Sequence, residues 1–356
     1  MKKVNELIKL PEVKTIFNLF NNNQGIYLVG GCIRDTLSAK EVTDIDFAID
    51  IDPEEVVKTL SNNNIKFYDI GINYGTVTAV IDSKNYEITS LREDIETDGR
   101  HAKVKYTSDI KADSLRRDFT INAIYANRDG ELFDFHNGID DIENRNLKFI
   151  GSANDRVKED YLRILRYFRF YADFSNFEID ANLKKVFKEG SKNFSKISKE
   201  RIWTELKKII NQNNSFKSLS MMNEANILTV ISKDIAVTDD YKRNSHIEDN
   251  TNKPIDYLLK LSILLENSEY KYDNFWKPLG PRFFHARGAK SANLDESRRG
   301  WAECVGLLGR ILRRGKIFVQ TPRIFESGTW SKKMDLEGQE DLDRMIQHAV
   351  PSWAAD

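Results

Sequence analysis

Two carboxylates separated by a single residue lie in an apolar stretch of the chain. Residues 44–51 read Asp-Ile-Asp-Phe-Ala-Ile-Asp-Ile, and with the two-residue period of a β-strand the apolar residues point one way while Asp44 and Asp46 point the other. Carboxylates side by side repel, and a divalent cation relieves that repulsion. Oxygen-only ligation suits Mg²⁺, which keeps water and substrate phosphates as further ligands. The pair therefore predicts a magnesium site, with a solvated strand edge as the alternative.

A glycine pair precedes these acids. Residues 27–35 read Tyr-Leu-Val-Gly-Gly-Cys-Ile-Arg-Asp, an apolar strand that runs into Gly30 and Gly31 and then into a helix. This arrangement places backbone N–H groups where a phosphate can approach, and Arg34 can bind the same phosphate. An ordinary strand-to-helix turn is the alternative for the glycines alone. Together with Asp44 and Asp46 the pattern is more specific, and no Walker A loop occurs in the sequence.

The elements that must position these residues alternate between two types. Short β-type runs are expected at 26–29, 45–51, 76–81, 86–89 and 131–135, and helices at 1–20, 32–38, 53–61 and 113–125. This alternation predicts an α/β head domain over residues 1–150. After residue 155 amphipathic helices dominate to about 270, so a helical body is expected over residues 151–272.

Composition marks a third segment. Asparagine occurs 28 times in residues 1–272 and only at Asn274 and Asn293 afterwards, so residues 273–356 are treated as an atypical tail of uncertain order. Lysine plus arginine (54) nearly equals aspartate plus glutamate (55), so any basic surface must be local.

The cysteines and the apolar runs bear on the compartment. The chain has two cysteines, Cys32 and Cys304, which fits a reducing compartment and no disulfide partner. No apolar run has the length of a signal peptide or a membrane helix. A cytoplasmic protein without a membrane partner is expected.

Over residues 25–210 the chain resembles the class II tRNA nucleotidyltransferases (CCA-adding enzymes), which share their head domain with bacterial poly(A) polymerases. The resemblance implies an α/β nucleotidyltransferase head, a DNA polymerase beta-like mixed sheet with helices, followed by an all-α neck and body. It assigns catalytic magnesium to Asp44 and Asp46. It assigns nucleotide binding to Gly30, Gly31, Arg34 and Asp35.

Two further segments gain a role from the resemblance. Glu87 lies on a strand expected to form a hairpin with 76–81 across residues 82–85, so it can point towards the aspartates as a further metal ligand or lie on the surface. Residues 92–101 alone indicate a charged, mobile loop with a glycine hinge. The resemblance implies that this loop switches the enzyme from adding C to adding A, through Arg92, Asp98, Gly99 and Arg100.

Residues 114–123, Ser-Leu-Arg-Arg-Asp-Phe-Thr-Ile-Asn-Ala, are expected to place Arg117 and Asp118 at the start of a helix, with Asn122 one turn on. The arginine can donate two hydrogen bonds to a triphosphate, and the acid can accept one from a ribose hydroxyl. Arg-Asp pairs are usually surface salt bridges. The segment is similar to the ribose-discriminating motif of the family, which implies nucleotide binding here.

Residues 155–170 are expected to form one amphipathic helix. Its buried stripe is Tyr161, Ile164, Leu165 and Phe168, and its opposite side carries Arg156, Glu159, Arg163, Arg166 and Phe170. Asp160 and Arg163 can offer an acceptor and a donor fork to a base edge, and Arg166 is a further nucleotide-binding residue. The alternative is a simple Glu159–Arg163 ion pair. The segment matches the family's base-selecting motif.

The resemblance implies template-independent addition of C, C and A to the 3′ end of tRNA. The RNA 3′-hydroxyl would attack the α-phosphorus of CTP or ATP and expel pyrophosphate, with Mg²⁺ as the cofactor. Lys184, Lys185, Lys207 and Lys208 are candidates to bind RNA phosphates. The alternatives are a poly(A) polymerase, which adds AMP to RNA ends, and a catalytically impaired RNA-binding member. Addition of A alone also stays open.

Overall fold

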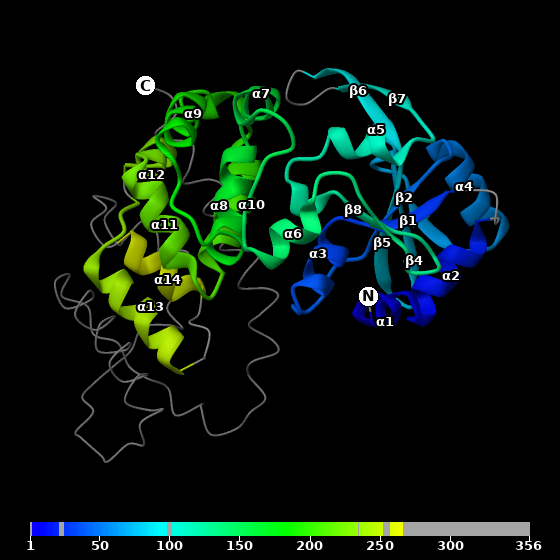
Figure 1. Cartoon of the computed structure of the whole chain (residues 1–356), viewed down its shortest axis with the longest axis horizontal. Coiled ribbons are helices and arrows are strands. Elements are labelled where there is room, and N and C mark those ends of the chain that lie inside the picture. Colours follow the sequence, from blue (N-terminus) through cyan, green and yellow to red (C-terminus); the bar gives the residue numbers. More distant parts are fainter. Residues whose placement is uncertain (1, 21–24, 98–101, 234, 252–256, 266–356) are drawn as a thin grey trace, which may run out of the picture. The chain divides into compact units, whose positions relative to one another are not determined.

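The computed structural model describes residues 2–20, 25–97, 102–233, 235–251 and 257–265 (Figure 1). The chain divides into two compact units with the boundary between Asn193 and Phe194. The first unit therefore contains the sheet and the helices up to residue 191. The atypical tail, 273–356, lies outside the described residues.

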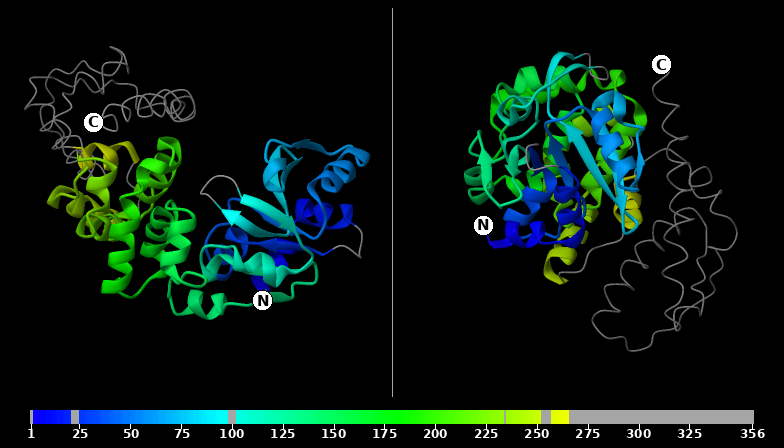
Figure 2. Two further views of the ribbon diagram at one scale, coloured as in Figure 1. Left: turned by 90° about the horizontal axis from the view of Figure 1, so that it is seen from above. Right: turned by 90° about the vertical axis from the view of Figure 1, so that its right-hand side faces the viewer.

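A seven-stranded sheet forms the centre of the first unit, in the order β3-β4-β5-β2-β1-β8-β9 (Figures 1 and 2). Its strands are β1 Ile26–Val29, β2 Asp46–Ile49, β3 Lys66–Tyr68, β4 Thr76–Ile81, β5 Lys84–Ser90, β8 Ile124–Ala126 and β9 Leu132–Asp134. β2 and β5 are parallel, whereas the other neighbours are antiparallel. The mixed sheet expected for the head is confirmed.

The β4–β5 hairpin has the shortest common turn. Asp82 and Ser83 both have positive φ, 49° and 62°, as the two central residues of a type I′ turn do. The second strand begins at Lys84, earlier than the expected residue 86. Across the hairpin Thr78 pairs with Glu87. The register places Glu87 beside Asp46 on the parallel neighbour β2.

Helices α1 to α6 lie around this sheet, whereas α7, α8 and α9 pack on one another to one side of it (Figure 1). They are α1 Lys2–Ile8, α2 Pro11–Leu19, α3 Gly31–Leu37, α4 Pro53–Asn62, α5 Ile110–Leu115, α6 Gly138–Glu143, α7 Ala153–Glu159, α8 Arg163–Phe174 and α9 Ala181–Ser191. Helix α2 packs on the sheet through Phe17, whose ring lies 5.5 Å from that of Phe47 in an edge-to-face arrangement. The single helix expected over residues 1–20 is broken, because Pro11 begins a new helix.

Two other helix predictions were wrong. Instead of a helix over 113–125, the chain has the end of α5, a 3₁₀ turn η2 (Thr120–Asn122) and strand β8. Instead of one helix over 155–170, α7 ends at Glu159 and α8 begins at Arg163. Asp160 between them is extended (φ −149°), and its carboxylate accepts a hydrogen bond from Leu162 N, which favours a new helix start.

Residues 92–97, expected to be part of a loop, form a strand. β6 (Arg92–Thr97) pairs antiparallel with β7 (Ala102–Tyr106). Asp98, Gly99 and Arg100, three of the residues expected in a mobile loop, lie outside the described residues.

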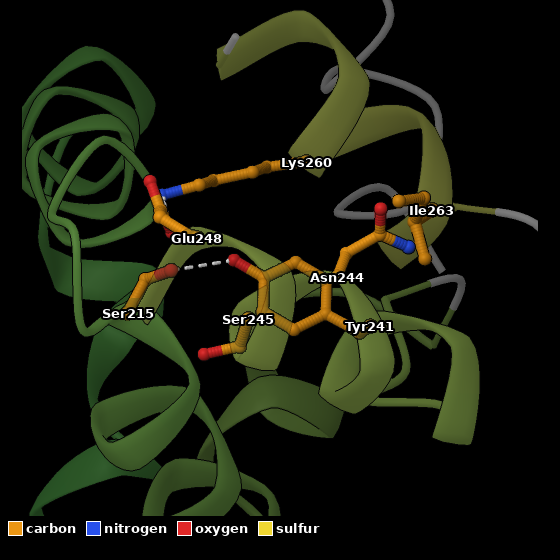
Figure 3. Close-up of a pocket in the computed structure, with 7 residues that line it drawn as sticks. All are labelled: Ser215, Tyr241, Asn244, Ser245, Glu248, Lys260 and Ile263. Carbon is orange, nitrogen blue, oxygen red and sulfur yellow. Dashed lines mark hydrogen bonds and ion pairs between the residues drawn. The ribbon is translucent and has the colours of Figure 1, made fainter. Parts of the chain in front are cut away.

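Helices make up the described part of the second unit: α10 Lys199–Ile210, α11 Ser215–Glu224, α12 Ile227–Ile231, α13 Asp239–Thr251 and α14 Tyr257–Leu264, after a 3₁₀ turn η3 (Phe194–Lys196). A pocket between α11, α13 and α14 is lined by polar groups (Figure 3). Lys260 Nζ lies 2.9 Å from Glu248 Oε2 and donates to Gln212 O at 2.7 Å, and the Ser215 and Tyr241 hydroxyls lie 2.8 Å apart. One ion pair and two hydrogen bonds thus involve the lining residues Glu248, Lys260, Ser215 and Tyr241.

Replacing Lys260 by methionine is expected to lower the free energy of unfolding by about 3–5 kcal/mol, because Glu248 would keep a buried charge without its counter-ion. The double variant Lys260→Met/Glu248→Leu removes both charges and should recover most of that loss. Urea unfolding of the three proteins measures both effects. A single variant as stable as the wild type would contradict the pairing.

Within the described residues, no helix is long and apolar enough to cross a membrane.

Candidate active site

The structure brings Asp46, Gly30 and Arg117 together. Asp46 is the first residue of β2, and Gly30 is the N-cap of α3 at the end of β1, with φ 78°. A Cβ atom on Gly30 would lie 4.0 Å from Asp46 Oδ2 and 3.6 Å from Arg117 Nη1. Glycine is favoured here because its φ is positive and because a side chain would fill the space between the acid and the arginine.

The charges around Asp46 favour a cation. Burial, together with the neighbouring carboxylates of Glu87 and Asp44, raises the pKa of Asp46 to about 6 against the opposing effect of Arg117 and Arg34. A divalent ion would relieve this repulsion. Among the described residues no three or more His, Cys, Asp or Glu form a group that could hold a metal. The donors therefore fit an ion held by two aspartates, with substrate oxygens or water completing its shell, and Glu87 does not complete such a group.

Without divalent metal, Asp46→Asn is expected to stabilise the protein at pH 7.5 by roughly 2–3 kcal/mol. The folded pKa of Asp46, about 6, lies above its ordinary value of 3.8, so the folded state holds the proton more tightly. The free energy of unfolding should therefore fall as pH rises from about 4 to about 6. Urea unfolding in EDTA at pH 4.5 and 7.5 measures this, and the variant should show a smaller decrease than the wild type. Equal decreases would contradict it.

Arg117 is held by a buried acid that the sequence analysis did not select. Its Nη2 donates to Asp113 Oδ2 at 3.3 Å and its Nε donates to the Tyr125 hydroxyl at 2.8 Å, while that hydroxyl donates to Asp113 Oδ2 at 2.6 Å. Burial alone would raise the pKa of Asp113, but Arg117 and Arg116 hold it below its ordinary value. Arg117 was expected at the start of a helix. This was wrong, because it follows the end of α5, where these contacts fix its position.

A second chain of contacts joins α3, η2 and α8. Arg34 forks Asp35 through Nε (2.9 Å) and Nη2 (2.7 Å) and donates from Nη1 to Asn122 Oδ1 at 2.6 Å. Asn122 Nδ2 then donates to Asp118 Oδ1 at 3.0 Å. Arg166 completes the chain with its Nε 2.7 Å from Asp118 Oδ2. Five predicted nucleotide-binding residues thus form one hydrogen-bonded chain.

Asp118 is buried and charged in this chain. Burial would raise its pKa, but Arg166, Asn122 and the Phe119 N–H lower it to about 2. Phe170 was expected on the polar side of its helix. That was wrong, since Phe170 is buried and the Arg34 guanidinium lies 4.6 Å from the centre of its ring.

Arg163 forms the ion pair that the sequence offered as an alternative. It pairs with Glu159, which also holds Arg156 at 2.7 Å. Its Nη2 donates to Arg116 O at 3.2 Å and its Nη1 donates to Arg156 O at 3.0 Å. Burial would raise the pKa of Glu159, and hydrogen bonds from Arg163 and Arg156 lower it. Asp160 lies in the extended link before Arg163 rather than one helical turn from it.

Two of the remaining predicted residues have clear positions. Gly31 is the first residue of α3, beside the Arg34 guanidinium. Arg92 begins β6, where its backbone N–H donates to Asp113 Oδ1 at 3.1 Å and its side chain donates to Tyr74 O.

Sequence reasoning missed Asp113 and Tyr125 as parts of the site. A signal for Asp113 was present, because an acid three and four residues before Arg116 and Arg117 can pair with both. Nothing comparable marked Tyr125, which reaches the arginine from strand β8.

Comparison with known families gives two matches. Residues 26–148 match the family described as Poly A polymerase head domain, and residues 176–238 match the one described as Probable RNA and SrmB-binding site of polymerase A. The first match contains the sheet and the candidate active site up to Asn122.

Named relatives are similar over about half of the chain or somewhat more. The mitochondrial CCA tRNA nucleotidyltransferase 1 of Homo sapiens is 42% identical over 202 residues, covering 56% of this chain and 46% of the relative. That of Danio rerio is 39% identical over 229 residues, covering 61% and 53%. The CCA-adding enzyme of Streptococcus gordonii is 38% identical over 186 residues, covering 52% and 45%. The chain thus spans about half the length of these curated relatives.

Solved structures are also similar. The Bacillus stearothermophilus CCA-adding enzyme in complex with CTP matches with a TM-score of 0.53 and 27% identity, covering 60% of this chain and 52% of that one. An apo form of a CCA-adding enzyme matches with a TM-score of 0.59 and 22% identity, covering 88% and 76%, which shows the shared fold.

Proposed function

Because the chain belongs to the tRNA nucleotidyltransferase/poly(A) polymerase family, we propose that it adds C, C and A to the 3′ end of tRNA from CTP and ATP, releasing pyrophosphate. One observation carries the proposal. Asp46, whose pKa is raised by burial and by the carboxylates of Glu87 and Asp44, lies beside a glycine turn and Arg117. A cation site next to a place for phosphates is what nucleotidyl transfer needs.

Mg²⁺ bound by Asp44 and Asp46 would activate the RNA 3′-hydroxyl and stabilise the pyrophosphate leaving group. The residues of the chain supply the positioning. Arg117 approaches the glycine turn from one side, where it can hold phosphate oxygens. Gly30 and Gly31 leave room for the phosphates, and no side chain acts as a nucleophile.

The chain from Asp35 to Arg166 would hold the nucleotide between α3 and α8. Each polar group in it already has a partner in the structure, so it provides a rigid wall. Arg34 lies across the rings of Phe170 and Phe174, which fixes the plane of its guanidinium. An oxygen of the ribose or of a phosphate would then replace one of the present hydrogen-bond partners of these residues.

Base selection would fall to Asp160 and Arg163. Glu159 fixes Arg163 from one side, and the carbonyl of Arg116 fixes it from the other. A guanidinium held in one plane can present the same donors to cytosine or adenine each time, without a template.

The relatives favour CCA addition over poly(A) synthesis. The curated proteins at about 40% identity carry names of CCA tRNA nucleotidyltransferases or CCA-adding enzymes, and the solved relative at 27% identity was crystallised with CTP. Retention of both Asp44 and Asp46 argues against a catalytically impaired member.

The remaining assignments rest on the same proposal. Residues 1–150 would form the catalytic head, and residues 151–272 would select the base and bind RNA through lysines such as Lys184, Lys185, Lys207 and Lys208. Switching from C to A would depend on Arg92 and on residues 98–100. A cytoplasmic location stays a prediction, and the vertebrate relatives carry a mitochondrial name.

The test uses tRNAs that end before C, after C, after CC and after CCA, each incubated with the full chain, Mg²⁺ and single nucleotides or CTP with ATP. We expect growth to the CCA end and then a stop. Extension by many A residues would identify a poly(A) polymerase, and growth only from the CC end would identify an A-adding enzyme. No incorporation in any arm would contradict the proposed function.

A further inference from the structure

One buried carboxylate beside the candidate active site accepts four hydrogen bonds and forms an ion pair with one further guanidinium nitrogen. Asp113, on α5, has 0% exposure. Its Oδ1 accepts from Arg92 N at 3.1 Å and from Arg116 Nε at 2.8 Å, and Arg116 Nη2 forms an ion pair with the same oxygen at 2.8 Å. Its Oδ2 accepts from the Tyr125 hydroxyl at 2.6 Å and from Arg117 Nη2 at 3.3 Å. Each oxygen thus serves a different set of partners.

The Oδ2 side leads to the phosphate end of the candidate site. Tyr125 donates to Asp113 and accepts from Arg117 Nε, so the acid and the hydroxyl together fix two of the three guanidinium nitrogens. The third, Nη1, donates to Asn122 O at 3.5 Å and lies 3.6 Å from where a Cβ on Gly30 would be. The direction of Arg117 is therefore set by Asp113.

The Oδ1 side leads to the base end. Arg116 is the C-cap of α5, where backbone carbonyls lack helical partners. Its carbonyl accepts from Arg163 Nη2 at 3.2 Å. The two bonds from the Arg116 side chain to Asp113 Oδ1 hold this residue in place, so the position of the Arg163 guanidinium depends on Asp113 through one intermediate.

We propose that Asp113 is a positioning residue that sets the spacing between Arg117 at the phosphate end and Arg163 at the base end of a bound nucleoside triphosphate. This inference rests on the proposed function, because it takes Arg117 as a phosphate contact and Arg163 as a base contact. It adds that a single carboxylate, which touches neither substrate nor metal, adjusts both ends together. Charge supports this role, since two guanidinium groups converge on one buried anion.

Three variants separate the two sides of Asp113. Tyr125→Phe removes the hydroxyl that fixes Arg117 and leaves the bonds of Arg116. Arg116→Ala removes the contacts of the Arg116 side chain with Oδ1 and leaves the Arg92 N–H bond, Tyr125 and Arg117 in place. Asp113→Asn has the same shape as the wild type but loses the charge that both arginines share.

Equilibrium binding to the full chain with Mg²⁺ measures each end separately. The ratio of the dissociation constants of CMP and CTP reports the contribution of the β- and γ-phosphates. The ratio for UTP and CTP reports base discrimination. Neither ratio changes when a variant only lowers the fraction of folded protein, because that affects all ligands equally.

We expect Tyr125→Phe to reduce the CMP/CTP ratio about tenfold and to leave the UTP/CTP ratio unchanged. Arg116→Ala should reduce the UTP/CTP ratio about tenfold and leave the CMP/CTP ratio unchanged. Asp113→Asn should reduce both. If Asp113→Asn does not fold, the inference is still supported when Tyr125→Phe changes only the CMP/CTP ratio and Arg116→Ala changes only the UTP/CTP ratio.

Unchanged ratios in Tyr125→Phe and Arg116→Ala, or equal changes of both ratios in each, would overturn it. A wild-type protein that binds no nucleotide would instead contradict the proposed function. The two failures are therefore distinguishable.

Discussion

Replacing Asp44 by alanine is expected to lower nucleotide incorporation by more than about a hundredfold while the protein stays folded. The side chain is exposed, and its described contact is with the neighbouring Thr43 hydroxyl at 3.2 Å, so its loss removes little packing. Its negative charge contributes to the raised pKa of Asp46, which places it near the proposed cation. Without it, Asp46 alone would have to hold the metal.

The measurement is single-turnover incorporation of labelled CMP into tRNA that lacks its CCA end, at saturating Mg²⁺. Asp129→Ala is a matched control, because it also removes an exposed acid, in the turn between β8 and β9. The control should react at the wild-type rate. An Asp44→Ala enzyme with comparable turnover would refute the metal assignment.

Replacing Arg163 by alanine is expected to remove most discrimination among the four nucleoside triphosphates. A bidentate contact between a guanidinium and a base is worth about 1–3 kcal/mol of selectivity, which corresponds to roughly 5- to 150-fold. Glu159→Gln should weaken selectivity in the same direction, because it loosens Arg163 without removing it. Incorporation of each nucleotide in turn, expressed as kcat/KM, measures the effect.

Lys158→Ala serves as the control for Arg163→Ala, since it removes an exposed positive charge from the neighbouring helix α7. Its selectivity should equal that of the wild type. If Arg163→Ala keeps the preference for CTP and ATP over UTP and GTP, the base-pairing role of Arg163 is wrong.

The sequence was informative where a local pattern decides the structure. Strand β1 and the turn at Gly30 follow from an apolar run and two glycines, and β4 with β5 follows from alternation around polar turn residues. The position of Glu87 beside Asp46 also follows from the strand pattern, once β5 lies next to β2.

Some local contacts and all long-range contacts could not be obtained in this way. The break before α8 depends on a local hydrogen bond from Leu162 N to the Asp160 carboxylate, which competes with the continuous helix that the apolar period alone favours. Phe170 was expected on the polar side of its helix, because its partner, Arg34, is on a helix far away in sequence. The contacts of Asp113 with Tyr125 on β8 and with Arg92 on β6 depend on how these strands lie against α5, so no local pattern indicated them.

Manganese binding tests the central claim, that Asp44 and Asp46 together hold a divalent ion. Mn²⁺ is titrated into the wild type, Asp44→Ala/Asp46→Asn and the Asp129→Ala control, each saturated with an unreactive CTP analogue, and free Mn²⁺ is followed by electron paramagnetic resonance. We predict that the wild type and the control take up Mn²⁺ beyond the amount bound by the analogue alone, and that the double variant does not. Equal uptake by all three proteins would contradict the account.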